Sequence, residues 1–234
     1  MKNLHVIGAV TNLGLKPYDD CRPRGVDRAA AVYRELGLVR RLGAVDRGDV
    51  VAQPYRDLFP IEGRVRNDDL IAEYAHRLAA AIDDDAFPLI VGGDCSILLG
   101  SLLGLRRRGR VGLAFIDGHS DFATLNASTS KAAAGMDLAL ATGHGDTPLA
   151  RLAGEPLVRE EDVVLIGRRD QYEDHLLEFP LARTKIRDVS ARDARPPTGD
   201  GFFIHVDADV LDSKVMPAVD SPEDGGLSVQ ELAG

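Results

Sequence analysis

The sequence has no tryptophan, only two cysteines and no long apolar run. Its longest aliphatic stretch, residues 97–105, is about half the length that a bilayer-spanning helix needs. The first residues lack the apolar core and the cleavage pattern of a signal peptide. Cys21 and Cys95 stand in unrelated contexts, and a structural disulfide is rare in a reducing compartment. We therefore expect a cytoplasmic protein with no membrane partner.

Positive charge is also scarce. Lysine and arginine number 28 against 37 aspartates and glutamates, which gives a formal net charge of −9. The one short basic run, residues 106–108, falls where a helix is expected to end, and cations favour that position. No basic face is left for a phosphate backbone, so we expect no nucleic acid partner.

Length and composition set the domain organisation. With 234 residues, of which 44% are hydrophobic, the chain can bury one sizeable core. We expect a single domain over residues 1–234. Ser228 and Glu231 form a capping box that opens a helix, yet the sequence ends at Gly234. A helix that short is unstable alone, which suggests a chain truncated at its C-terminus.

Apolar periodicity alternates between strand and helix patterns along the chain. Strands are predicted at residues 4–10, 87–91, 111–116, 163–167 and 202–206, and helices at residues 26–36, 67–82 and 97–105. Such alternation favours an α/β fold with a mostly parallel central sheet between two layers of helices, a three-layer αβα sandwich.

Three aspartate-rich segments follow predicted strands. They are VGGDCS at residues 91–96, FIDGHSD at 115–121 and HVDADVLD at 205–212. The carboxyl ends of parallel strands meet at one edge of a sheet, where α/β proteins place their sites. Carboxylates and an imidazole gathered there can hold two divalent cations that activate a shared water. The segments therefore predict a two-metal hydrolytic site.

Spacing within the second segment strengthens this prediction. Asp117, His119 and Asp121 alternate directly after the apolar residues 113–116, where charged groups without a cation would be costly to bury. The alternative is a simple turn whose histidine is satisfied by hydrogen bonds.

The third segment has strand spacing. A period of two places His205, Asp207 and Asp209 on one strand face, where two carboxylates and an imidazole can converge. The alternative is a pair of solvated aspartates that cap a helix, and this motif is weak when taken alone.

Together these motifs resemble the arginase and agmatinase ureohydrolases, a family of binuclear manganese enzymes. Residues 92–96 (GGDCS), 117–121 (DGHSD) and 205–213 (HVDADVLDS) are similar to the family's Gly-Gly-Asp-His-Ser, Asp-Ala-His-x-Asp and Ser-x-Asp-x-Asp-x-x-Asp-Pro signatures. Their order and spacing agree, and the resemblance extends over nearly the whole chain.

The resemblance implies a specific metal site. One metal would be held by Cys95, Asp117, Asp121 and Asp207, and the other by Asp117, His119, Asp207 and Asp209. It implies two Mn²⁺ ions and a metal-bridging hydroxide that attacks a guanidino or amidino carbon to release urea and an amine. It also implies a small guanidino-type substrate and a homo-oligomer, a trimer or hexamer.

Cys95 departs from the family pattern, because a histidine ligand is expected at that position. A thiolate there would favour softer ions such as Zn²⁺ or Fe²⁺ over Mn²⁺. Two alternatives stay open. Cys95 could remain a thiol with the first metal weakly bound, or it could be a small buried hydrophobe.

The residues at the family's proton-transfer and substrate-binding positions also differ from the family pattern. Ala134 stands where the family has a histidine that carries protons, so we assign that role to His205, with Asp121 as the other catalytic residue. A histidine that only supports the site or the core is the alternative for His205. Ser130 matches the family's substrate contacts. Other contacts differ, at Ala123, Ala132, Tyr172 and His175, which makes L-arginine a poor candidate. A catalytically silent metal-binding family member is the competing hypothesis.

Overall fold

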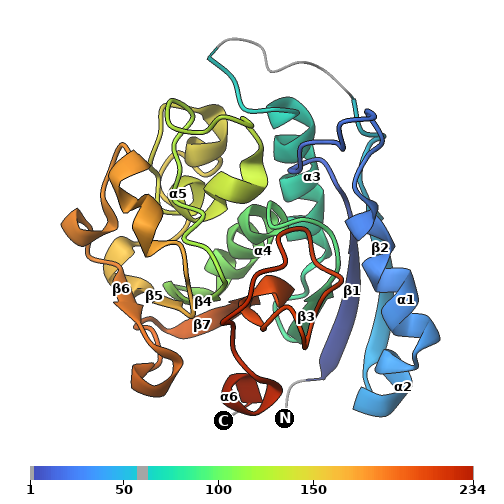
Figure 1. The fold of residues 1–234 in the computed structure, drawn as a ribbon. Coiled ribbons are helices and arrows are strands. Elements are labelled where there is room, and N and C mark those ends of the chain that lie inside the picture. The colour runs from blue at the N-terminus through green and yellow to red at the C-terminus, as the bar shows by residue number, and fades with distance from the viewer. Residues whose placement is uncertain (1–2, 57–62, 234) are drawn as a thin grey trace.

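Parallel strands form the centre of the protein (Figure 1). The computed structural model describes residues 3–56 and 63–233. Its strands are β1 (Leu4–Val10), β2 (Val45–Val51), β3 (Phe87–Val91), β4 (Val111–Ile116), β5 (Val163–Ile166), β6 (Arg187–Val189) and β7 (Gly201–Val206). They form two hydrogen-bonded groups, ordered β2-β1-β3 and β6-β5-β4-β7, in which every pairing is parallel.

Helices flank these strands. They are α1 (Ala29–Glu35), α2 (Leu38–Leu42), α3 (Asp68–Ala81), α4 (Ile97–Leu105), α5 (Asp137–Ala141) and α6 (Val229–Ala233), joined by short 3₁₀ turns. The α1 and α2 helices lie on one side of β1 and β2, and α3 and α4 lie on the other (Figure 1). The expected α/β class, parallel strands between helices, is confirmed.

The central strands are continuous apolar runs, as strands covered on both faces must be. In β1, Val6, Ile7 and Ala9 are almost fully buried, and in β4 the same holds for Leu113 and Phe115. Ile7, Ala9, Leu113 and Phe115 belong to a single hydrophobic cluster that extends to α3, α4 and α5. The strand ends that carry the acidic segments are therefore fixed by a continuous core.

Close packing of α3 and α4 fixes the helix that follows the first acidic segment. Leu70, Ile71, Tyr74, Ala75 and Leu78 form the buried stripe of α3, at the spacing of one helix face. A methyl group on Gly100 of α4 would lie 2.9 Å from the Ala75 carbonyl oxygen, so only glycine allows this approach. The start of α4, next to Cys95, is held by this contact.

Most predicted elements are confirmed, with small shifts at their ends. The strands at residues 4–10, 87–91 and 111–116 have the predicted bounds, and β5 and β7 differ by one residue. The helix predicted at residues 26–36 is wrong in its first turn, because Gly25–Arg28 forms a 3₁₀ turn before α1 begins. The β2 strand is not among the predicted elements, because its residues are mostly exposed and show no apolar pattern.

The capping box near the end of the sequence is confirmed. The Ser228 backbone N–H donates to Glu231 Oε2 at 2.9 Å, and the Glu231 N–H donates to Ser228 Oγ at 3.2 Å. The α6 helix follows directly. Among the helices of residues 3–56 and 63–233, none combines the length and the apolar character needed to cross a bilayer.

Candidate metal centre

Three strand ends bring the acidic segments together. Cys95 follows β3, Asp117 follows β4 and Asp207 follows β7. The last two are neighbours because β4 and β7 pair, and the Asp207 N–H donates to the Ile116 carbonyl oxygen at 2.9 Å. The Cys95 thiol donates to Asp207 Oδ2 at 3.0 Å. This contact joins the ends of the two strand groups.

Glycines set the path of the first segment. Gly92 and Gly93 have φ angles of 92° and 82°, a region that favours glycine. A methyl group on Gly93 would lie 2.7 Å from the Ala9 carbonyl oxygen. The double glycine is therefore required for the tight turn that delivers Cys95.

Asp117, His119 and Asp209 form a cluster that could hold a metal ion. His119 Nδ1 lies 3.0 Å from Asp209 Oδ2 and 3.7 Å from Asp117 Oδ1. One ligand atom from each of the three residues lies within 4.8 Å of the others. Imidazole nitrogen and carboxylate oxygen are a common donor set for divalent ions.

The strand-face explanation for the third segment is wrong. The β7 strand ends at Val206, and residues Ala208–Val210 form a 3₁₀ turn that Asp207 caps by accepting the Asp209 N–H at 2.9 Å. The turn bends Asp209 back toward the second segment, where its Oδ1 accepts the Gly118 N–H at 3.1 Å. The carboxylates converge through this turn and not through strand alternation.

The second segment is anchored from behind by Asp170. Ser120 donates to Asp170 Oδ2 from its backbone nitrogen at 2.8 Å and from its hydroxyl at 2.7 Å. Arg168 lies 3.2 Å from the other Asp170 oxygen. Ser120 stands between His119 and Asp121, so this network orients two predicted ligands. Asp121 itself has a left-handed backbone, with φ of 42°.

Burial and mutual repulsion perturb these groups strongly. Burial, together with the charges of Asp207 and Asp209, raises the pKa of Asp117 to about 8. Hydrogen bonds to Asp117 and Asp209 raise the pKa of His119 to about 11. Burial and neighbouring carboxylates, Asp207 and Asp117 respectively, raise the pKa values of Cys95 and Asp121 well above their ordinary range. The site concentrates negative charge that a cation would neutralise.

Unpaired atoms support the same fit. Among the described residues, the buried Asp117 Oδ2 has no hydrogen-bond partner, and an unpaired buried carboxylate is destabilising. Asp117, His119 and Asp209 supply carboxylate and imidazole donors, and these three residues fit a divalent ion. Among the described residues, Cys95, Asp121 and Asp207 do not belong to this close group.

His205 is buried next to Asp117 of this cluster. Its ring stacks on Phe115 with centroids 4.6 Å apart, and its Nε2 lies 3.9 Å from Asp117 Oδ2. Burial lowers the pKa of His205 to about 4, so the ring is neutral at physiological pH.

Ser130 belongs to the loop after the second segment. Its hydroxyl oxygen accepts the Ala132 N–H at 3.2 Å and lies 3.4 Å from Ser128 Oγ. Ala134 is buried in the 3₁₀ turn Ala133–Met136, and its backbone N–H donates to Gly14. No acid or base stands at that position, as the sequence indicated.

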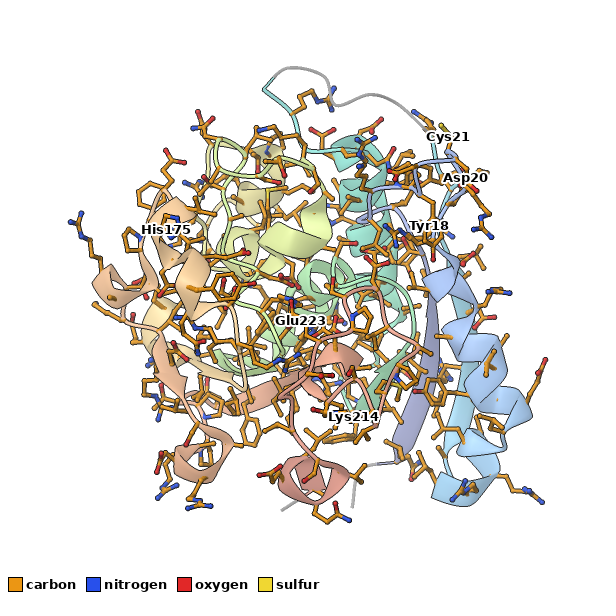
Figure 2. The ribbon with its side chains drawn as sticks, viewed as in Figure 1. Tyr18, Asp20, Cys21, His175, Lys214 and Glu223 are labelled. Atoms are coloured by element: carbon orange, nitrogen blue, oxygen red, sulfur yellow. The ribbon has the colours of Figure 1, made fainter. Side chains whose placement is uncertain are left out.

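Glu223 is a neighbour of the cluster that sequence reasoning missed. Its Oε1 lies 4.0 Å from His119 Nε2, and its Oε2 lies 3.9 Å from Arg169 Nε. In Figure 2 it lies near the middle of the molecule, whereas Tyr18 and His175 lie toward opposite sides. It reaches the site on a loop without a recognisable motif, so the sequence offered no signal.

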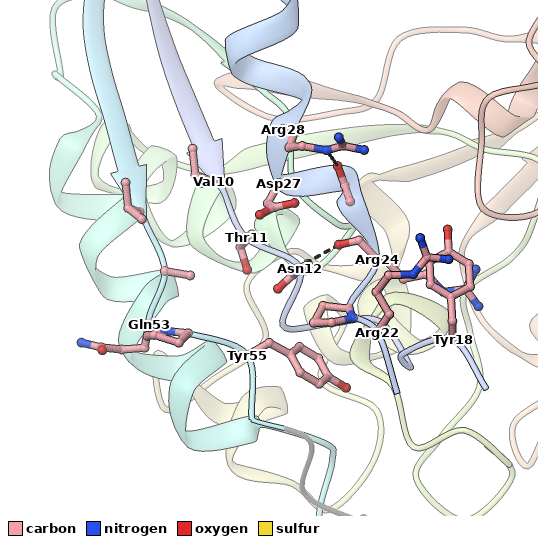
Figure 3. Close-up of a pocket in the computed structure, with 15 residues that line it drawn as sticks. Val10, Thr11, Asn12, Tyr18, Arg22, Arg24, Asp27, Arg28, Gln53 and Tyr55 are labelled. Atoms are coloured by element: carbon pink, nitrogen blue, oxygen red, sulfur yellow. Dashed lines mark hydrogen bonds between the residues drawn. The ribbon is translucent and has the colours of Figure 1, made fainter. Parts of the chain in front are cut away.

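A cavity of about 630 Å³ near the N-terminal loop contains none of the predicted ligands (Figure 3). Three arginines line it, but Arg24 is already engaged. Its Nη1 donates to Asp220 at 2.6 Å, and its guanidinium lies 3.9 Å from the centre of the Tyr18 ring. These contacts tie the N-terminal loop to the segment after β7.

Known proteins match this fold and sequence. A model of the arginase family matches residues 5–234. The arginase of Bacillus caldovelox is 32% identical over 257 residues, which cover 99% of this chain and 84% of that protein. For the arginase of Brevibacillus brevis the identity is 31%, with 98% and 83% covered.

Solved structures of arginase-type enzymes have a similar fold. The Bacillus caldovelox arginase aligns with a TM-score of 0.81 at 29% identity, over 99% of this chain and 84% of that chain. The agmatine ureohydrolase of Thermoplasma volcanium aligns with a TM-score of 0.64 at 22% identity, over 99% and 75%, which shows the shared fold alone. A family match over nearly the full sequence, together with this identity and this fold, means that the chain belongs to the arginase family.

Proposed function

We propose that the protein hydrolyses a guanidino or amidino compound with the help of divalent metal ions, and releases urea and an amine from a guanidino substrate. The observation that carries the proposal is the cluster of Asp117, His119 and Asp209, with its buried carboxylate that lacks a hydrogen-bond partner. Family membership supports the same chemistry, since relatives that are 32% and 31% identical to this chain are named arginases.

The proposed ligands are Cys95, Asp117, His119, Asp121, Asp207 and Asp209. Divalent ions held there would supply Lewis acidity and a hydroxide nucleophile. By family resemblance Asp117 and Asp207 would serve both ions, and in this structure Asp117 lies beside His119 while Asp207 lies beside Cys95. We propose Mn²⁺, with Zn²⁺ or Fe²⁺ as the alternatives that Cys95 favours.

The chain's own residues would orient the site and move protons. Asp170 fixes the segment that carries His119 and Asp121 through Ser120. His205 remains the proposed proton carrier because its Nε2 faces Asp117 and has no hydrogen-bond partner. Asp121 is the other proposed catalytic residue.

The substrate would differ from L-arginine. Ser130 remains the proposed substrate contact, although its oxygen already accepts one backbone hydrogen bond. Tyr172 and His175 stand where family arginases have acidic side chains, which removes partners for an amino group. A guanidino compound without that head group, or a hydroxylated guanidine, suits these residues better. We also propose that the protein is a homo-oligomer in the cytoplasm.

A catalytically silent metal-binding protein is the second candidate. Two observations favour it. Ala134 offers no acid or base, and the Cys95 thiol donates a hydrogen bond to Asp207 as a protonated group would.

Urea release separates the two candidates. The full chain would be loaded with Mn²⁺, Zn²⁺ or Fe²⁺ and screened against guanidino compounds, while release of an amide and an amine would report on amidines. Asp209→Asn is the control, since it removes a proposed ligand. We expect at least one substrate to be hydrolysed by the native chain and not by the variant. Bound metal without turnover on any compound would favour the silent protein.

A further inference from the structure

Asp137 is a buried carboxylate without a hydrogen-bond partner. It is the first residue of α5, its exposed fraction is 0%, and neither of its carboxylate oxygens has a partner among the described residues. A buried polar group without a hydrogen-bond partner is destabilising. We therefore expect Asp137 to bind a partner that neutralises its charge.

Buried aspartates outside the proposed metal site have partners. Asp94 accepts hydrogen bonds from the Ser96 N–H at 3.0 Å and from the Thr11 hydroxyl at 3.4 Å. Asp162 is paired with Arg110 and accepts a hydrogen bond from the Thr198 hydroxyl. Within residues 3–56 and 63–233, no cation or hydroxyl group is hydrogen-bonded to Asp137, and in this respect it resembles Asp117 of the proposed site.

The position of Asp137 is next to the proposed metal ligands. Two residues further on, the Ala139 N–H donates to the Asp121 carbonyl oxygen at 3.3 Å, which ties the start of α5 to the second acidic segment. The negative charge of Asp137 raises the pKa values of Cys95 and Asp121. The hydrogen bond to Asp121 therefore places the start of α5 beside that residue, and the charge of Asp137 acts on both Cys95 and Asp121.

Negative groups surround Asp137 in turn. Burial contributes most to raising its pKa well above the ordinary value, followed by the charge of Asp117 and, more weakly, that of Asp207. The neighbouring Leu138 N–H opposes this shift weakly, and its geometry is too poor to count as a hydrogen bond to either carboxylate oxygen. A proton would neutralise the carboxyl group but would leave its O–H without an acceptor, whereas a divalent ion satisfies the oxygen and the charge together.

We propose that Asp137 is a further ligand of the metal ion on the Cys95 and Asp121 side of the site. This inference rests on the proposed function, which places a metal there. A carboxylate adds a hard oxygen donor beside the soft thiolate of Cys95, and hard donors favour Mn²⁺. Asp137 would thereby offset the loss of the histidine that the family has at position 95.

Metal titration of Asp137→Asn tests the inference. Asparagine has the shape of a protonated aspartate but is a weaker, uncharged ligand. We expect the native chain to bind two Mn²⁺ ions and the variant to bind one of them at least about tenfold more weakly, in calorimetry and in Mn²⁺ electron paramagnetic resonance. Asp146→Asn, an exposed change a few residues beyond α5, is the matched control and should bind like the native chain.

Folding is checked separately. In chelator, Asp137→Asn should melt at or above the temperature of the native chain, because it removes an uncompensated buried charge. Its melting temperature should rise less on adding Mn²⁺. Superimposable Mn²⁺ titrations of variant and native chain would overturn the inference. Failure of the proposed function has a different signature, which is a native chain that binds Mn²⁺ and hydrolyses no guanidino or amidino compound.

Discussion

The Cys95 thiol donates a hydrogen bond to Asp207 Oδ2 at 3.0 Å, across the gap between two groups of strands. Each residue follows a different strand, so the contact depends on the whole fold. Asp207 is also the cap of the turn that carries Asp209. A substitution at Cys95 should therefore change the positions of the Asp207 and Asp209 carboxylates in the proposed metal site.

Cys95→His should change metal selectivity. An imidazole replaces the soft sulfur donor, so the affinity for Mn²⁺ relative to Zn²⁺ should rise roughly tenfold. Competition titrations with the two metals would measure this ratio. Cys21→Ser, at the exposed cysteine, is the control and should leave the ratio unchanged. An unaltered ratio in Cys95→His would remove Cys95 from the ligand set.

Asp209→Asn should lower metal content. The carboxylate lies 3.0 Å from His119 Nδ1, and its replacement by an amide leaves that metal with a weaker donor. We expect the loss of about one equivalent of metal after extensive dialysis, measured by elemental analysis. Asp200→Asn is the control, because Asp200 directly precedes β7 and accepts the Arg110 N–H at the opposite end of β4 from Asp117. Equal metal content in the two variants would contradict the cluster assignment.

Much of this site was predictable from the sequence because its supporting strands are buried. The apolar runs of β1, β3 and β4 have clear ends, and a parallel sheet brings strand ends to one edge. The edge strand β2 was not predictable, since its exposed polar residues carry no apolar pattern. The strand spacing expected for residues 205–209 is also wrong, because the backbone turns after Val206 instead of extending.

The role proposed for Asp137 could not be predicted from the sequence. An aspartate at the start of a helix is ordinary, because it complements the helix dipole. Only the fold reveals that this one is fully buried without a partner. Glu223 is similar, since its nearness to His119 depends on the path of the loop after β7. Side chains that reach a site from irregular segments carry no periodic signal.

Metal affinity should rise with pH. Without metal, Asp117 with a pKa of about 8 and His119 with a pKa of about 11 hold protons at pH 7. A metal must displace these protons to bind. Binding should therefore release protons near pH 7 and tighten from pH 6 to pH 8. Calorimetry in two buffers of different ionisation enthalpy measures this release, and identical heats in both would contradict it.

Thermal stability in the presence of a chelator should fall as the pH rises, whereas metal affinity should rise. Both groups have pKa values above their ordinary values of 3.8 and 6.5, so each contributes stability at low pH that is lost as the pH rises through its folded value. For Asp117 the loss runs from about pH 4 to about pH 8. The melting temperature in chelator should fall from pH 6 to pH 9, whereas Mn²⁺ should reverse the trend. A rising melting temperature in chelator would contradict these directions.

Arg168→Met should destabilise the fold and loosen the site. The Arg168 side chain is 4% exposed and lies between Asp174 at 2.7 Å, Asp188 at 2.7 Å and Asp170 at 3.2 Å. Its removal leaves these carboxylates without their cation, at a cost of about 3 kcal/mol in the free energy of unfolding. Urea denaturation with metal present would measure the change. Arg183→Met, at an exposed arginine, should stay within about 0.5 kcal/mol of the native chain.

The same variant tests how the metal ligands are oriented. Asp170 holds Ser120 by two hydrogen bonds, and without Arg168 its carboxylate is free to shift. His119 and Asp121, on either side of Ser120, should then bind metal less tightly even under conditions where the variant is folded. A folded Arg168→Met protein with native metal affinity would show that Ser120 keeps its place without this support, and that the ligands are positioned by the strand ends alone.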